Sequence, residues 1–188
     1  MDSEKIKILE EIYRLESQKC TNNTDFDRNT VGSEAYGETG YDSFQIIINK
    51  YKQHFNDNTV FYDLGSGCGK IVFHVGIMCD VKKSCGIEFS KNRHENSMKT
   101  LEKYNHENII FMNDNILNVD FSDATVIYLD NTLFPREITN KIYDKIPKDC
   151  LVFSRQMFME SRRKNELIEI MRVYTNYGTS DLHVMIKK

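Results

Sequence analysis

A run of glycines that directly follows an apolar segment is the first feature of this sequence whose residue types are suited to chemistry. It occupies Asp63-Leu64-Gly65-Ser66-Gly67-Cys68-Gly69-Lys70 and follows a G-x-G-x-G pattern. A nicotinamide-binding fingerprint needs glycine where Lys70 stands, and a P-loop needs Ser or Thr where Ile71 stands. Glycines at such a turn let the backbone approach a ligand closely. The run therefore indicates either a ligand-binding turn without a phosphate cradle or an ordinary glycine turn.

Two acidic residues that follow later apolar runs add to this turn. Glu88 lies 25 residues beyond Asp63, and an acid at a similar distance (roughly 20 residues) accepts the ribose hydroxyls in dinucleotide folds. Asp114 follows the next apolar run and is suited to accept the amino group of an adenine. Each acid by itself is more often a solvated loop carboxylate. If the three features meet in one crevice, they form an adenosine pocket.

Alternating apolar segments predict the fold that would bring these residues together. Strand-like runs separated by helical patterns lie at residues 60–62, 84–87, 109–112, 125–129 and 150–153. This alternation implies a parallel sheet covered by helices, in which ligands bind at the carboxyl ends of the strands. Apolar runs at 168–174 and 182–186 predict a terminal antiparallel hairpin around Asn176-Tyr177-Gly178.

The segment before this alternation is expected to form a helix and a long loop. Apolar residues at helical spacing predict a helix from Ser3 to about Ser17, and the polar residues from Cys20 to Tyr41 indicate a loop of a length that is usually functional or disordered. Asp42 is expected to cap a second helix, and Ser90 and Pro135 are expected to begin later ones.

Composition limits the classes of protein to consider. The chain has 188 residues, and we expect one domain, with a helix and cofactor-closing loop over 1–42 and an α/β core over 43–188. A net charge of −3 argues against tight, unaided nucleic-acid binding. No apolar run approaches the roughly 20 residues of a membrane span. The five cysteines show no zinc-ligand spacing, so no metal is expected and a reducing, intracellular location fits.

The motifs together resemble the seven-stranded, class I S-adenosylmethionine-dependent methyltransferases. Asp63-x-Gly65-x-Gly67-x-Gly69, Gly86-Ile87-Glu88 and Asp114 carry this resemblance. It implies an α/β fold with a Rossmann-like sheet, mostly parallel with a C-terminal antiparallel hairpin. It also implies S-adenosyl-L-methionine as the cofactor.

A narrower resemblance is to the DOT-one (disruptor of telomeric silencing) family, the non-SET lysine methyltransferases of core histones. Tyr36-Gly37-Glu38-Thr39-Gly40-Tyr41-Asp42 is similar to the Tyr-Gly-Glu-Thr loop of that family, and Asp130-Asn131-Thr132-Leu133-Phe134-Pro135 is similar to its Asn-rich segment ending in Pro. The order and approximate spacing agree from about Tyr36 to Phe153. The sequence departs from the family in three ways: Lys70 stands in place of a Gln, Asp130 stands in place of an Asn, and the family's aromatic pair before the last strand is poorly matched, since Ser180-Asp181 precedes Leu182-His183.

The resemblance implies roles for the matching residues. The cofactor-binding set would be Glu38, Thr39, Asp63, Gly65, Gly67, Gly69, Lys70, Glu88, Asp114 and Asn115. Within this set, Glu88 would bind the ribose, and Asp114 with Asn115 would flank the adenine. The catalytic set would be Tyr36, which closes over the methionine end of the cofactor, and Asp130 with Asn131, which face the sulfonium and the entering amine.

Several roles stay open at this point. Asp130 would bind the acceptor, act as a base, or only orient Asn131. Arg155 would meet an acidic substrate or cap the sheet. His74, like the other histidines at helical positions, shows no partner in the sequence and is not expected to be catalytic.

The function that these motifs favour is methyl transfer from S-adenosylmethionine to a protein lysine, with a histone or nucleosome as the suggested substrate. The location would then be nuclear, and a separate partner would target this small module. The alternatives are a class I methyltransferase for RNA, a translation protein or a small amine, and a cofactor-binding subunit without catalysis. No membrane partner is expected.

Overall fold

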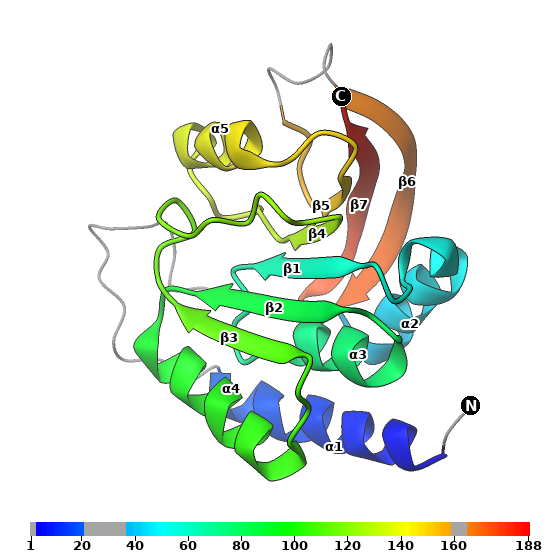
Figure 1. Cartoon of the computed structure of the whole chain (residues 1–188), viewed down its shortest axis with the longest axis vertical. Coiled ribbons are helices and arrows are strands. Elements are labelled where there is room, and N and C mark those ends of the chain that lie inside the picture. The colour runs from blue at the N-terminus through cyan, green and yellow to red at the C-terminus, as the bar shows by residue number, and fades with distance from the viewer. Residues whose placement is uncertain (1–2, 21–36, 159–164) are drawn as a thin grey trace.

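The computed structural model describes residues 3–20, 37–158 and 165–188, and for residues 15–20 the backbone alone. A twisted sheet runs through the centre of this part of the chain, with helices on both faces (Figure 1). The last two strands curve along one edge of the sheet and bring the C-terminus to the top of the view. The domain boundaries given above stay a prediction.

The sheet has seven strands in the order β3-β2-β1-β4-β5-β7-β6. They are β1 Val60–Leu64, β2 Lys83–Glu88, β3 Ile109–Asn113, β4 Val126–Leu129, β5 Leu151–Ser154, β6 Asn165–Thr175 and β7 Gly178–Lys187. Strands β1 to β5 are parallel, whereas β7 pairs antiparallel with β5 and β6. The expected fold class is therefore confirmed. The hairpin is longer than expected, so that only Asn176 and Tyr177 remain between its strands.

The helices lie close to their expected positions. They are α1 Ser3–Cys20, α2 Tyr41–Lys50, α3 Lys70–Met78, α4 Lys91–Tyr104 and α5 Arg136–Lys145, with a 3₁₀ turn η1 over Lys52–His54. Ser90 caps α4 as expected, since its side chain accepts a hydrogen bond from the Arg93 amide at 3.3 Å.

Two predicted helix starts are wrong, that of α2 by two residues and that of α5 by one. The cap of α2 is Gly40, without a side-chain hydrogen bond, and Asp42 lies within the first turn. Its charge still suits that position, because the helix dipole is positive there. Pro135 is the cap of α5 and not its first residue.

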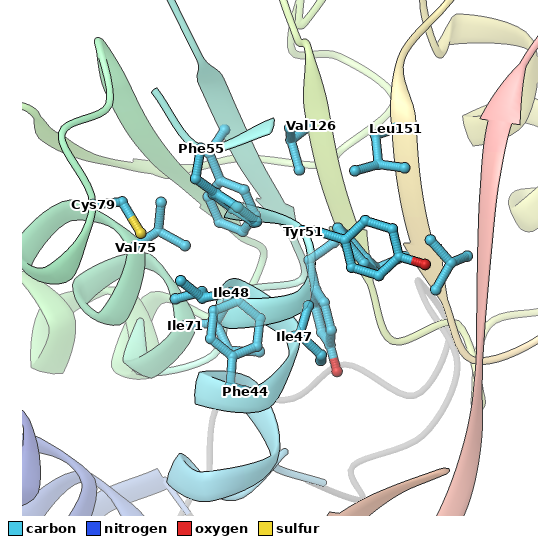
Figure 2. Close-up of a cluster of buried hydrophobic side chains, with 14 of the residues drawn as sticks. Phe44, Ile47, Ile48, Tyr51, Phe55, Ile71, Val75, Cys79, Val126 and Leu151 are labelled. Atoms are coloured by element: carbon cyan, nitrogen blue, oxygen red, sulfur yellow. The ribbon is translucent and has the colours of Figure 1, made fainter. Parts of the chain in front are cut away.

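Apolar packing fixes α2 on the sheet. Figure 2 shows Phe44, Ile47 and Ile48 of α2 close to Ile71 and Val75 of α3, and all five side chains are buried in one cluster. Burial of each large apolar side chain contributes about 1.5–3 kcal/mol. Because α2 begins directly after residues 37–40, this packing also sets where that segment lies.

His74 joins three helices. Its Nδ1 lies 3.0 Å from the Tyr13 hydroxyl of α1, and its Nε2 lies 3.0 Å from Oε1 of Gln45 in α2. Since Oε1 of Gln45 only accepts, Nε2 carries the hydrogen and Nδ1 accepts from Tyr13. Burial lowers the pKa of His74 to about 3. The histidine is therefore a neutral, structural residue, which agrees with the expectation that it is not catalytic.

This burial predicts a specific loss of stability in acid. The unfolded chain protonates His74 near its ordinary pKa of about 6.5, whereas the folded protein does so only near 3. Stability from the neutral imidazole is therefore complete above pH 6.5 and falls as the pH drops toward 3. Between pH 7 and pH 5 the free energy of unfolding should fall by about 2 kcal/mol from this residue.

Urea unfolding at both pH values measures this effect. His74→Gln should be less stable at pH 7 but should lack this part of the pH dependence. The comparison between the two proteins is needed because Asp63, whose pKa is raised by burial, shifts stability in the opposite direction. Equal pH dependence in wild type and variant would contradict the prediction.

Candidate cofactor and acceptor site

The glycine run turns from the carboxyl end of β1 toward β2. The amides of Gly65 and Ser66 both donate to the Ile87 carbonyl, at 2.9 and 3.0 Å. The backbone φ angle is positive at Gly65, Gly67 and Gly69, with values of 93°, 56° and 83°, a conformation that residues other than glycine rarely adopt. A Cβ on Gly69 would also lie 2.4 Å from the Phe111 ring. Glycine is therefore required at position 69 by both the backbone and its neighbour.

Glu88 ends β2 and holds this turn in place. One carboxylate oxygen accepts from the Gly67 amide at 2.7 Å, and the other accepts from the Ser90 amide at 2.8 Å. The residue is 7% exposed. A carboxylate offers about four acceptor sites, so one in this position suits ligand hydroxyls as well as backbone amides.

Asp63 lies at the end of β1, in register with Gly86 on one side and Tyr128 on the other. Burial raises the pKa of Asp63 well above its usual value, and the Glu88 and Asp130 carboxylates raise it further. Within the described part of the chain, its carboxyl group accepts no hydrogen bond. A cationic group beside Asp63 would relieve both the repulsion and the missing contacts.

The segment before α2 reaches the same end of the sheet, where the parallel strands have their carboxyl ends. We call residues 37–40 the flap. Glu38 forms an ion pair with Lys70 at 2.5 Å between Oε2 and Nζ, and both side chains are buried. The Thr39 hydroxyl lies 2.6 Å from the Tyr128 hydroxyl, also in a buried position. The structure therefore brings Glu38, Thr39 and Lys70 to the carboxyl ends of the parallel strands, whereas Tyr36 lies outside the described residues.

Asp130 follows β4 and is the centre of a polar cluster. One of its oxygens accepts from the amide and hydroxyl of Thr132, at 3.2 and 2.6 Å. The other lies 3.3 Å from Nε of Arg155 and 3.5 Å from the Tyr177 hydroxyl. The side chain of Arg155 is only 1% exposed. Both oxygens of Asp130 thus already have donors.

Asn131 joins the ends of two strands. Its carboxamide oxygen accepts from the Gln156 amide at 2.8 Å, and its Nδ2 donates to the Gln156 carbonyl at 3.1 Å. The residue is fully buried. This geometry favours a positioning role for Asn131, which holds the segment after β4 against the segment after β5.

Asp114 and Asn115 directly follow β3, the edge strand next to β2. Asp114 accepts from the Asn115 amide at 2.6 Å and from Nδ2 of Asn118 at 3.0 Å, and Asn115 accepts from the Leu117 amide at 2.9 Å. These contacts shape the loop and leave Asp114 exposed. The adenine contact assigned to the pair stays a prediction.

Metal ligation has no structural support in the described ranges 3–20, 37–158 and 165–188, where no group of three or more His, Cys, Asp or Glu side chains is arranged to hold an ion. The carboxyl groups of Asp63, Glu88 and Asp130 are instead spread over the ends of three neighbouring strands. Such an arrangement suits a cationic organic ligand.

The family model described as histone methylation protein DOT1 matches residues 20–184. The chain belongs to the DOT1 family. It is 29% identical over 131 residues to the H3 lysine-79 specific histone-lysine N-methyltransferase of Caenorhabditis elegans. That match covers 62% of this chain and 14% of the relative, so this DOT1 family chain spans only a small part of the relative's length.

Solved structures share the fold. One is an RNA methyltransferase from Salinibacter ruber in complex with S-adenosyl-L-homocysteine, with a TM-score of 0.63 at 19% identity over 80% of this chain and 94% of that one. Another is magnesium protoporphyrin IX methyltransferase from Synechocystis with bound SAM, with a TM-score of 0.61 at 11% identity over 78% and 79% of the two chains. At these identities the similarity shows the fold alone.

These findings confirm the expected family and the class I methyltransferase fold, and membership of the DOT1 family supports the expected S-adenosylmethionine-dependent methyltransferase class. None of the helices in the described residues is long and apolar enough to cross a membrane. The roles of single site residues stay predictions.

Sequence reasoning missed several residues of this site. The turn at Asn176-Tyr177 was expected, but nothing in the sequence indicated that it lies against the flap and Asp130. Asn113, which donates to the Glu88 and Phe89 carbonyls at 2.9 and 3.1 Å, carried no motif signal either. Arg155 was recognised as a candidate, and the structure favours neither of its two expected roles but a contact with Asp130.

Proposed function

We propose that this DOT1 family member transfers a methyl group from S-adenosylmethionine to a lysine side chain of a histone. The observation that carries the proposal is the buried carboxyl group of Asp63, which has no hydrogen-bonding partner in the described residues. Asp63 lies at the end of β1, in register with Tyr128, whose hydroxyl contacts Thr39 of the flap. A buried carboxyl group of this kind is stabilised by a cation, and the cofactor carries an ammonium and a sulfonium.

The residues present fit this cofactor. Asp63 would accept hydrogen bonds from the ammonium group, which are stronger than neutral ones. Glu88, at the end of β2, would accept the ribose hydroxyls, and Asp114 with Asn115 would flank the adenine. The open glycine turn allows close backbone approach. The cofactor supplies an activated methyl group, so the protein mainly has to align the reactants.

The acceptor side must hold a neutral amine. A free lysine has a pKa of about 10.4, and an apolar, water-poor channel favours its neutral form. Asp130 already accepts hydrogen bonds at both oxygens, from Thr132 and from Arg155. We therefore assign Asp130 to holding the acceptor side in position and Asn131 to fixing the loop that carries it.

A histone is the acceptor supported by the family and by the relative specific for H3 lysine-79. The net charge of −3 also suits a basic protein better than a free nucleic acid. With this acceptor, the location is nuclear, and a partner that recruits the short chain to nucleosomes would complete the function.

The test is incubation with methyl-labelled S-adenosylmethionine and recombinant nucleosomes, free core histones or total RNA. We expect label on a histone lysine, identified by mass spectrometry, and none with Asp63→Asn. Label on RNA alone would contradict the lysine proposal. Calorimetric binding of the cofactor without label on any acceptor would favour a non-catalytic subunit.

A further inference from the structure

The two residues of the β6–β7 turn contact both the flap and the Asp130–Arg155 pair. We use "the turn" for Asn176 and Tyr177. The amide of Asn176 donates to the Glu38 carbonyl at 3.1 Å, and its Oδ1 accepts from the Glu38 amide at 3.0 Å. This reciprocal pair fixes the backbone of the flap residue that contacts Lys70.

Neighbouring contacts extend this attachment along β6. Thr39 and Thr175 form an antiparallel bridge, and the Gly40 amide donates to the Tyr174 carbonyl at 3.0 Å. The flap is thus added to the free edge of β6 as a short piece of strand. Any shift of the end of the hairpin would move the flap with it.

Tyr177, the second residue of the turn, faces the acceptor side. Its hydroxyl lies 3.3 Å from Nη2 of Arg155 and 3.5 Å from Oδ2 of Asp130. Its ring lies against Gly37, where an added Cβ would come within 2.3 Å of the ring carbon Cε1. One tyrosine therefore contacts the flap with its ring and the Asp130–Arg155 pair with its hydroxyl.

The burial of Arg155 makes its contact with the Tyr177 hydroxyl costly to break. Its guanidinium is almost completely buried, and its Nη1 has no hydrogen-bond partner in the part of the chain that the structure describes. A buried guanidinium that gives up its contact with Tyr177 would lose one of its few partners, which is costly. Movement of the turn away from Arg155 is therefore disfavoured.

We propose that the turn couples cofactor binding to acceptor positioning, with Asn176 as a positioning residue for the flap and Tyr177 as a positioning residue for the Asp130–Arg155 pair. The proposal rests on the proposed function. Coupling of this kind is reciprocal, so a bound acceptor should tighten cofactor binding by the same factor by which the cofactor tightens acceptor binding.

The first measurement is the dissociation constant of S-adenosylhomocysteine by calorimetry. Asn176→Ala removes the side-chain acceptor of the Glu38 amide and should raise this constant about tenfold, the equivalent of one lost hydrogen bond. Asn176→Asp keeps an acceptor oxygen and should restore most of the affinity. Asn58→Ala is the matched control, because Asn58 is also an exposed turn residue, and among the described residues its side chain and amide hydrogen-bond with Asp57 and Asn56 and not with the site.

The second measurement is the same titration with and without saturating nucleosomes. Wild type should bind S-adenosylhomocysteine more tightly with nucleosomes. Tyr177→Phe keeps the ring against Gly37 and should bind S-adenosylhomocysteine normally alone, but lose this tightening and about fivefold in kcat/KM. Gly37→Ala displaces the Tyr177 ring and should weaken both S-adenosylhomocysteine binding and its tightening by nucleosomes.

The outcomes separate this proposal from the proposed function. Wild-type affinity in Asn176→Ala, or full nucleosome tightening in Tyr177→Phe, would overturn the role of the turn even if histones are methylated. A wild type that binds S-adenosylhomocysteine but labels no histone contradicts the acceptor instead. In that case the Asn176 titrations decide alone, with a tenfold loss in Asn176→Ala supporting the role and unchanged affinity overturning it.

Discussion

Replacement of Glu88 by alanine is expected to weaken S-adenosylmethionine binding by about 100-fold or more. The carboxylate anchors the Gly67 amide at 2.7 Å and the Ser90 amide at 2.8 Å, and in the proposed complex it also accepts the ribose hydroxyls. Hydrogen bonds to a charged group contribute about 1.5–3 kcal/mol each. Loss of two such bonds is enough for a change of this size.

Two further variants separate the contributions of Glu88. Glu88→Gln keeps the shape but places an NH₂ group against one amide donor, so it should lose about half of the binding free energy lost by Glu88→Ala. Glu95→Ala is the matched control, because Glu95 is half-exposed on α4 and its only ion pair within the described ranges is with Lys91, at 3.8 Å. Calorimetry measures all three, and thermal unfolding checks that each variant is folded. An affinity of Glu88→Ala within threefold of wild type would disprove the assigned pocket.

The parts of the fold that the sequence predicts well are those decided by local pattern. The apolar runs of β1, β4 and β5 are buried on both faces, which is why they carry no alternation and are easily recognised. The glycines at 65, 67 and 69 are predictable because their positive φ values permit little else. Glu88 follows from the topology, since parallel strands end at one edge.

The parts that the sequence does not predict depend on contacts between distant segments. Glu38 meets Lys70, and Asp130 meets Tyr177, only because the sheet order places their elements together. A single sequence shows that His74 lies on an apolar face but not that Tyr13 and Gln45 meet its two nitrogens. Asn131 resembles an active-site amide in the motif, yet its carboxamide is used by the Gln156 backbone.

Replacement of Lys70 by methionine is the second large effect that we expect, with a loss of about 3 kcal/mol in the free energy of unfolding. The Lys70–Glu38 pair is buried, at 5% and 9% exposure of its side chains. Removal of one partner from a buried pair leaves a charge in a poorly solvated place, which typically costs about 3–5 kcal/mol. The flap cannot easily turn Glu38 outward, because Asn176 and Tyr174 hold its backbone.

Because of the position of Lys70, removal of the Glu38 carboxylate should lower the free energy of unfolding at least as much as removal of the Lys70 ammonium. Lys70 is the first residue of α3, where the positive end of the helix dipole disfavours a cation. Glu38→Gln would leave the ammonium buried there without its carboxylate. The double variant Lys70→Met/Glu38→Gln removes both charges, so it should be more stable than either single variant. This order of stabilities distinguishes an ion pair from simple loss of packing, which would add up in the double variant.

Urea unfolding at pH 7 measures the free energy of unfolding of wild type, of the two single variants and of the double variant. Lys141→Met is the control, because Lys141 pairs with Glu137 on the exposed face of α5 and should change stability little. The family resemblance places a glutamine at position 70, so Lys70→Gln with Glu38 retained would test whether a neutral donor is enough to hold the flap. If Lys70→Met alone matches wild type in stability and in cofactor affinity, the ion pair does not hold the flap, and the flap must depend on its contacts with β6.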